Sequence, residues 1–132
     1  MDVFTALNKL YDRFGRQLQA GEVICTEGED SSEMYFILEG GVDVYKKVAT
    51  TDKDGENVKL TSLGATDFFG EMSLLNGEKR SATIIANTNG TKIVRISPGN
   101  FDTIIKLQPQ IAITMLKVLC KRLRSTSEKI KK

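Results

Sequence analysis

The chain has 132 residues, of which 40% are apolar and 27% charged, as expected for one globular domain with one hydrophobic core. Nineteen Lys and Arg residues against seventeen Asp and Glu give a formal net charge of +2, which argues against a general nucleic-acid coat. With no histidine and no CxxC pair, the sequence excludes a histidine general base and disfavours a structural zinc site.

The two cysteines, Cys25 and Cys120, are interpreted as small buried apolar residues in a reducing compartment. The N-terminal residues lack the basic start and apolar run of a signal peptide. The longest apolar stretch, 111–120, is interrupted by Thr114 and Lys117 and is too short to span a bilayer. We therefore expect a cytoplasmic protein without membrane contact.

Apolar residues recur at three- and four-residue spacing over 3–14, which predicts an amphipathic helix with Asp2 capping its start and Gly15 its end. From residue 16 onward, short apolar segments alternate with Gly and Asp turns, and the polar stretch 50–57 is typical of an exposed hairpin tip. The segments predict strands near 16–19, 22–26, 34–39, 42–48, 58–63, 81–87 and 91–96. Strands at this spacing favour a sandwich, a barrel or a jelly roll.

The segment 98–129 predicts two helices, with Pro98 and Pro109 each in a first turn. Leu116, Leu123 and Ile130 are spaced by sevens, so the helix 109–129 carries an apolar seam. This seam is compatible with a partner helix from a second copy and with packing against the β-roll. The basic residues near the C-terminus are interpreted as a solvated helix face. They are Lys117, Lys121, Arg122, Arg124, Lys129, Lys131 and Lys132.

One segment, 68–83, interrupts the strand series. Gly70 allows an unusual turn or a close backbone approach, and the following residues suit one helical turn that Asn76-Gly77 ends. The free N–H groups at the start of such a turn attract an anion, to which Arg80 offers a planar fork. From these residues alone, solvated or mutually paired Glu71 and Arg80 remain an alternative, as does a plain hairpin turn at Asn76-Gly77.

This segment resembles the phosphate-binding cassette of the cyclic nucleotide-binding domain family. The matching residues are Phe69-Gly70-Glu71, Ser73, Leu74-Leu75 and Arg80-Ser81-Ala82-Thr83. Gly21, Gly28 and Gly40 match the turn glycines of the family, 35–40 matches its third strand, and 121–129 resembles the end of the sensor domain of bacterial catabolite activators.

The resemblance implies one domain over 1–132, mainly β, built as a double-stranded β-helix (jelly roll) over 16–97 with the cassette at 69–83. An N-terminal helix, 3–14, and two C-terminal helices, 98–129, flank the roll.

The resemblance also implies roles for individual residues. The Glu71 carboxylate accepts the ribose 2′-hydroxyl, assisted by the backbone at Gly70. Arg80 neutralises the cyclic phosphate. The N–H groups of Met72 and Ser73 face the phosphate, and the Ser81 hydroxyl lies beside it. Thr126, with Ser127 from a second subunit, contacts the adenine amino group if the chain dimerises through 109–129. Phe69 completes the implied ligand-binding set.

We therefore expect a regulatory sensor that binds a cyclic nucleotide and repositions its C-terminal helices. Thr126-Ser127 favours cAMP over cGMP, whereas Ser81 does not decide between them. No enzymatic activity and no cofactor are expected, because the chain lacks metal-binding histidines and clustered metal-binding carboxylates. Direct DNA binding is not expected from these residues. The alternative is a degenerate family member that serves as an interaction module without ligand.

Overall fold

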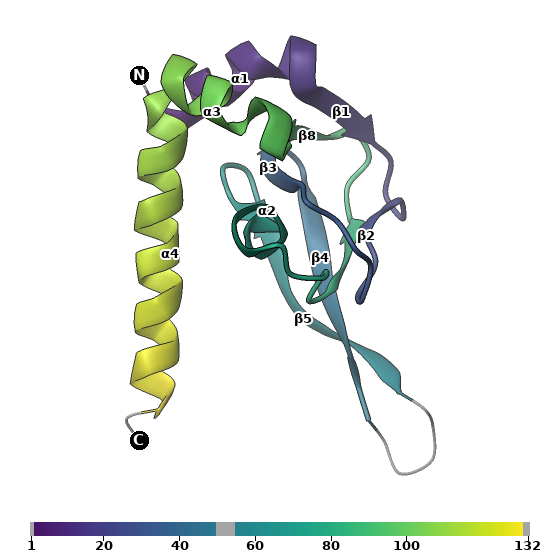
Figure 1. Cartoon of the computed structure of the whole chain (residues 1–132). Helices are drawn as coiled ribbons and strands as arrows, with labels where there is room; N and C mark the ends of the chain where they lie inside the picture. Colours follow the sequence, from purple (N-terminus) through teal and green to yellow (C-terminus); the bar gives the residue numbers. More distant parts are fainter. Residues whose placement is uncertain (1, 50–54, 131–132) are drawn as a thin grey trace.

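The computed structural model describes residues 2–49 and 55–130, in which one helix precedes a β-roll and two helices follow it (Figure 1). The described helices are α1 (Val3–Phe14), α2 (Glu71–Asn76), α3 (Pro98–Leu107) and α4 (Pro109–Ile130). The described strands are β1 (Gly15–Leu18), β2 (Val23–Cys25), β3 (Met34–Glu39), β4 (Gly41–Val48), β5 (Glu56–Gly64), β6 (Phe68–Phe69), β7 (Thr83–Ala86) and β8 (Thr91–Ile96).

The strands form two four-stranded antiparallel sheets. The first sheet has the order β1-β8-β3-β6 and the second β2-β7-β4-β5, so neighbours in space are mostly distant in sequence. Apolar side chains from both sheets form a common core that includes Ile37, Val42, Ile84 and Ile93. The predicted mainly-β jelly roll, flanked by an N-terminal helix and two C-terminal helices, is confirmed.

Strand β3 explains how the helices attach to the roll. Its side chains alternate, with Met34 and Phe36 in a cluster shared with α1, α3 and α4, and Tyr35 and Ile37 in the core between the sheets. Because both faces of β3 are covered, its sequence is a continuous apolar run rather than an alternating one. The helices therefore rest on the sheet that also carries β6, directly before the cassette.

The predicted starts of α1, α3 and α4 are confirmed, and α4 extends one residue beyond the predicted end at 129. The Asp2 Oδ1 accepts a hydrogen bond from the Thr5 N–H at 2.8 Å, which caps α1. Pro98 and Pro109 are the first residues of α3 and α4, where a missing N–H costs nothing. Among the described residues, no single helix is long and apolar enough to cross a membrane; only α3 and α4 taken together, across a bend of 106°, reach that composition.

Several sequence predictions need correction. Strand β6 is absent from the predicted strands, because two residues are too short to display a period of two. The predicted strand 81–87 is shorter, Thr83–Ala86, since Ser81 and Ala82 remain in the cassette loop. Cys25 is buried as predicted, but Cys120 is exposed on α4. The predicted hairpin tip lies largely at 50–54, outside the described residues.

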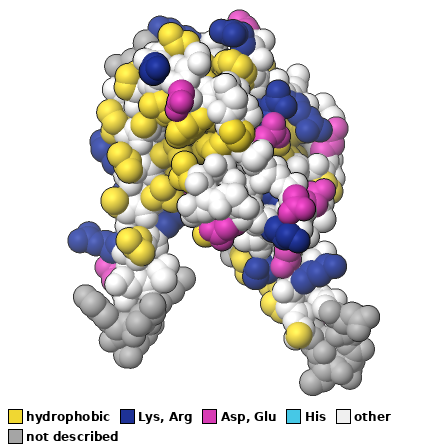
Figure 2. Space-filling view, viewed as in Figure 1, with side chains coloured by type: hydrophobic (Ala, Val, Ile, Leu, Met, Phe, Trp, Pro, Cys, Tyr) yellow, Lys and Arg dark blue, Asp and Glu magenta, His cyan; other side chains and the backbone are white. Residues whose placement is uncertain are grey.

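Apolar side chains are also present on the surface. Figure 2 shows a concentration of them on the face that carries the upper part of α4 and the adjoining surface of the roll. Exposed apolar residues on α3 and α4 are Leu107, Ile113, Leu116 and Leu123. The surface of α4 is therefore apolar well beyond the residues that pack against the roll.

Candidate functional site

The cassette is shaped by two glycines with positive φ. Gly70, at φ +84°, follows β6 and is the N-cap of α2, and Gly77, at φ +68°, is its C-cap. A Cβ on Gly70 would lie 2.6 Å from Nη1 of Arg80 and 2.9 Å from the carbonyl oxygen of Glu33. The glycine predicted from sequence is thus required both by its backbone conformation and by the close approach of an arginine.

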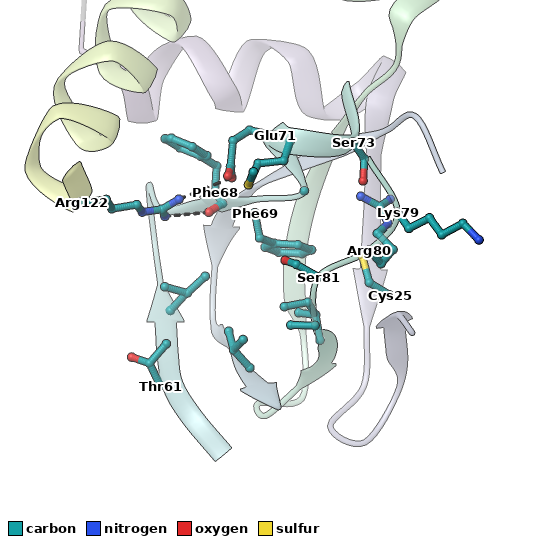
Figure 3. Close-up of a pocket in the computed structure, with 16 residues that line it drawn as sticks. Cys25, Thr61, Phe68, Phe69, Glu71, Ser73, Lys79, Arg80, Ser81 and Arg122 are labelled. Atoms are coloured by element: carbon teal, nitrogen blue, oxygen red, sulfur yellow. Dashed lines mark hydrogen bonds and ion pairs between the residues drawn. The ribbon is translucent and has the colours of Figure 1, made fainter. Parts of the chain in front are cut away.

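A cavity of about 240 Å³ opens beside the cassette. It is lined by Cys25, Val44, Thr61, Leu63, Phe68, Phe69, Gly70, Glu71, Met72, Ser73, Lys79, Arg80, Ser81, Ala82, Ile84 and Arg122. In Figure 3, Glu71 and Arg122 lie on one side of this pocket and Arg80 and Ser73 on the other, while Lys79 points away. The pocket therefore has the Glu71 carboxylate beside Arg122 on one side and the guanidinium of Arg80 on the other.

The structure brings most of the predicted site residues to this cavity. Those that line it are Phe69, Gly70, Glu71, Met72, Ser73, Arg80 and Ser81. Thr126 and Ser127 are exposed on α4 and are not among the lining residues. The Thr126 hydroxyl donates to the Arg122 carbonyl at 3.1 Å, within its own helix.

The guanidinium of Arg80 is buried, with the residue only 6% exposed. Its Nη1 donates to the Glu33 carbonyl at 2.6 Å and its Nη2 to the Ser31 hydroxyl at 2.7 Å. Within residues 2–49 and 55–130, no carboxylate oxygen lies within 4.0 Å of it. The guanidinium of Arg80 is thus hydrogen-bonded only to neutral oxygens and has no counter-ion in the described part of the chain.

The polar groups of Ser73 and Ser81 differ in availability. The Ser73 hydroxyl donates to the Glu78 carbonyl at 2.7 Å and its N–H to the Gly70 carbonyl at 3.2 Å, so both hold the cassette together. The Ser81 carbonyl accepts from Lys46 Nζ at 2.9 Å, while the residue itself is exposed at the cavity wall. Of the two serines, Ser81 is the one whose hydroxyl is available to a ligand.

Arg122 is a site residue that sequence reasoning missed. Its Nη2 donates to the Phe68 carbonyl at 2.9 Å, its Nη1 lies 3.4 Å from the Glu71 carboxylate, and its guanidinium stacks 4.6 Å from the Phe68 ring centroid. The prediction of a solvated basic face is therefore wrong for this residue. A signal was present, because Arg122 follows the buried Met115 by seven residues, on the same face of α4.

Two neutral groups, Cys25 and Tyr35, lie near Arg80. Burial raises the pKa of the Cys25 thiol to about 11, although the nearby Arg80 opposes the shift. Burial, with the carboxylate of Glu33, raises the pKa of the Tyr35 hydroxyl to about 12. At neutral pH the thiol is protonated and the pocket wall has no thiolate at this position, so Cys25 is a packing residue rather than a nucleophile.

Comparisons with known proteins agree with this geometry. Residues 15–108 match the model of the family described as the cyclic nucleotide-binding domain. A cyclic nucleotide-gated potassium channel of Rhizobium etli is 39% identical over 107 residues, which cover 81% of this chain and 27% of the channel. A cAMP-activated global transcriptional regulator of Haemophilus influenzae is 36% identical over 104 residues, which cover 78% of this chain and 44% of the regulator.

The fold has close structural neighbours as well. The catabolite activator protein of Thermus thermophilus superposes with a TM-score of 0.77 at 24% identity, over 96% of this chain and 58% of that one. The curated relatives are regulators and channels, and this chain spans less than half of their length. The family match, the fold and the cassette all lead to one conclusion: this chain belongs to the cyclic nucleotide-binding domain family.

Proposed function

We propose that this chain is a cytoplasmic sensor module that binds cAMP in preference to cGMP and has no enzymatic activity of its own. The observation that carries the proposal is the buried Arg80 at the cavity wall, without a carboxylate within 4.0 Å among the described residues. A buried charge is stabilised by a partner of opposite sign. A cyclic phosphate, with its single negative charge, supplies that partner.

The opposite side of the pocket suits the sugar. The Glu71 carboxylate lies there, and an ionised carboxylate accepts hydrogen bonds from hydroxyl groups. We assign Glu71 to the ribose 2′-hydroxyl and Ser81 to the phosphate beside Arg80. Phe69 and Ala82 supply apolar wall to the same pocket.

Binding would be transmitted to α4 through Arg122. This residue joins α4 to Glu71 and to Phe68, and the ribose would use the same carboxylate. A ligand shifts the position of α4 only by its different affinity for the two arrangements. Competition for Glu71 provides such a difference, because a ribose hydroxyl on this carboxylate weakens the ion pair that holds α4 against the cassette.

The preference for cAMP depends on a second copy of the chain. We propose a homodimer through α4, in which Thr126 and the partner's Ser127 reach the adenine amino group. Leu116 and Leu123, at 64% and 71% exposure, supply an apolar seam on α4. The name of the Haemophilus influenzae relative, a cAMP-activated regulator, supports the choice of nucleotide.

Thermal melting with each nucleotide tests the proposed function, because a ligand that binds only the native state raises the melting temperature. We expect a concentration-dependent rise with cAMP, a smaller rise with cGMP and none with 5′-AMP, whose open phosphate does not fit a site for a cyclic one. A larger rise with cGMP would overturn the choice of cAMP. No rise with either cyclic nucleotide would favour an interaction module without ligand.

A further inference from the structure

The segment 28–33 holds both the backbone and the side chain of Arg80, although its sequence predicts only a turn. The Arg80 N–H donates to the Glu29 carbonyl at 2.9 Å, and the Gly28 N–H donates to the Arg80 carbonyl at 2.8 Å. The side chain is held by Ser31 and by the Glu33 carbonyl. The orientation of the guanidinium is thus set by a segment some 50 residues away in sequence.

Only one of these four contacts is made by a side chain of the segment. The Ser31 hydroxyl oxygen accepts from Nη2 at 2.7 Å, and it also lies 3.4 Å from the Glu33 N–H. A hydrogen bond to a charged donor is shorter and stronger than a neutral one, which agrees with the short distance. Ser31 does not line the cavity, so it has no direct route to a ligand there.

The two side-chain bonds leave the rest of the guanidinium for the ligand. An arginine carries five N–H donors, of which one Nη1 and one Nη2 proton are used here. The face of the group lies 5.7 Å from the ring centroid of Tyr35, which limits rotation about the side chain. Without the Ser31 hydroxyl, Nη2 loses its acceptor. The guanidinium then keeps one hydrogen bond, from Nη1 to the Glu33 carbonyl, and its orientation is less restricted.

We infer that Ser31 is a positioning residue that fixes the orientation of the Arg80 guanidinium for a cyclic phosphate. The inference rests on the proposed function and adds to it a residue outside the pocket that affects the affinity for the ligand. Its expected contribution is specific, because Ser31 acts only on the phosphate end of the ligand and only through Arg80. A purely structural role would instead change the binding of every ligand and the stability of the fold.

The test is calorimetric titration of the chain with cAMP and with adenosine, which lacks the phosphate. We expect Ser31→Ala to weaken cAMP binding about tenfold, the effect of one hydrogen bond to a charged group, and to leave adenosine binding unchanged. Ser31→Thr, which keeps the hydroxyl, restores binding. Ser32→Ala is the matched control, because Ser32 is the exposed neighbour of Ser31 and makes no side-chain hydrogen bond among the described contacts.

A double-mutant cycle with Arg80→Gln establishes the route. If Ser31 acts through Arg80, Ser31→Ala changes the affinity of the Arg80→Gln variant less than about twofold. An equal tenfold loss in both backgrounds would overturn the inference, as would a Ser31→Ala variant that binds cAMP as tightly as the unmodified chain. Failure of the unmodified chain to bind either cyclic nucleotide would instead overturn the proposed function, so the two failures are distinguishable.

Discussion

Gly70 connects backbone geometry to ligand chemistry in a single residue. Its φ of +84° is a strained backbone conformation for any residue with a Cβ. In addition, the space that a Cβ would need is occupied by Nη1 of Arg80. Gly77 has a similar φ of +68°, but a Cβ at that position would meet nothing within 4 Å. A substitution at Gly77 therefore tests backbone strain alone, whereas one at Gly70 adds a steric clash.

This difference gives a prediction at the residue scale. Gly70→Ala is expected to weaken cAMP binding by more than about tenfold, because the new methyl group displaces the guanidinium. Gly77→Ala carries similar strain, about 1 kcal/mol, and is expected to keep the affinity within about threefold. Calorimetric titration of both variants checks this. Equal losses of affinity would contradict the steric explanation.

Cys25 and Tyr35 predict how stability depends on alkaline pH. Burial raises the pKa of Cys25 from 9.0 to about 11 and that of Tyr35 from 10.0 to about 12. The folded state then keeps protons that the unfolded chain has lost, so the free energy of unfolding is at its full value below pH 9 and falls as pH rises towards 11 and 12. Melting curves at about pH 8 and about pH 10.5 test this, with a smaller decline expected for Cys25→Ala. A decline as steep as that of the unmodified chain would exclude Cys25 as its source.

At the scale of the elements, α4 has the largest expected role in transmitting ligand binding, because Arg122 on this helix contacts the cassette. Its N-terminal half is anchored by Ile111 and Met115, both buried with α1 and β3. Farther along, Arg122 supplies the contacts with Phe68 and Glu71. The helix extends beside the roll as a separate rod in Figure 1. Arg122 therefore links the ligand site to the C-terminal half of α4.

We predict that Arg122→Met loosens α4 and the cassette together. The lost ion pair is partly exposed, so the expected cost is about 1 kcal/mol, equivalent to about fivefold faster amide exchange in both segments. Hydrogen exchange followed by mass spectrometry measures this directly. Arg124→Met is the matched control, because Arg124 is exposed and has no ion-pair partner in the described part of the chain. Unchanged exchange in α4 would show that the helix is held by other contacts.

The helices and most strands could be predicted because their signals are local. Proline, cap residues and a regular apolar period define α1, α3 and α4, and the alternation of glycines with apolar runs defines the strands. Strand β6 could not be predicted, since Phe68-Phe69 pairs with Tyr35 and Phe36 only through the tertiary fold. Its residues were visible in the sequence only as part of the cassette.

The same distinction between local and tertiary signals applies to the site. Gly70, Glu71 and Arg80 lie within one contiguous segment, so a sequence motif reveals them. Ser31 and Arg122 are contributed by the segment 28–33 and by α4, which only folding brings to the cassette. Their roles depend on distances that a sequence does not contain.

At the scale of the whole molecule, the apolar seam on α4 predicts assembly. Leu116 and Leu123 are exposed, one heptad apart, on the helix that we propose as the dimer interface. The double variant Leu116→Glu with Leu123→Glu is expected to be a monomer at concentrations where the unmodified chain is a dimer. Light scattering coupled to gel filtration measures the mass.

A control for this prediction is available on the roll. Leu60, 56% exposed on β5, is equally apolar and belongs to the sheet β2-β7-β4-β5, whereas α4 packs on the other sheet. Leu60→Glu is expected to leave the mass unchanged. If the double variant on α4 kept the mass of the unmodified chain, the interface would lie elsewhere and Thr126 and Ser127 would lose their proposed role.

The guanidinium of Arg80 is the proposed partner of the cyclic phosphate, and calorimetric titration of cAMP into the unmodified chain and into Arg80→Gln tests this pairing most directly. Removing one partner of a desolvated charge pair typically costs about 2–5 kcal/mol, so we expect saturable binding that becomes about 30- to several-thousand-fold weaker in the variant. A folded Arg80→Gln variant that binds cAMP within about threefold of the unmodified chain would contradict the account.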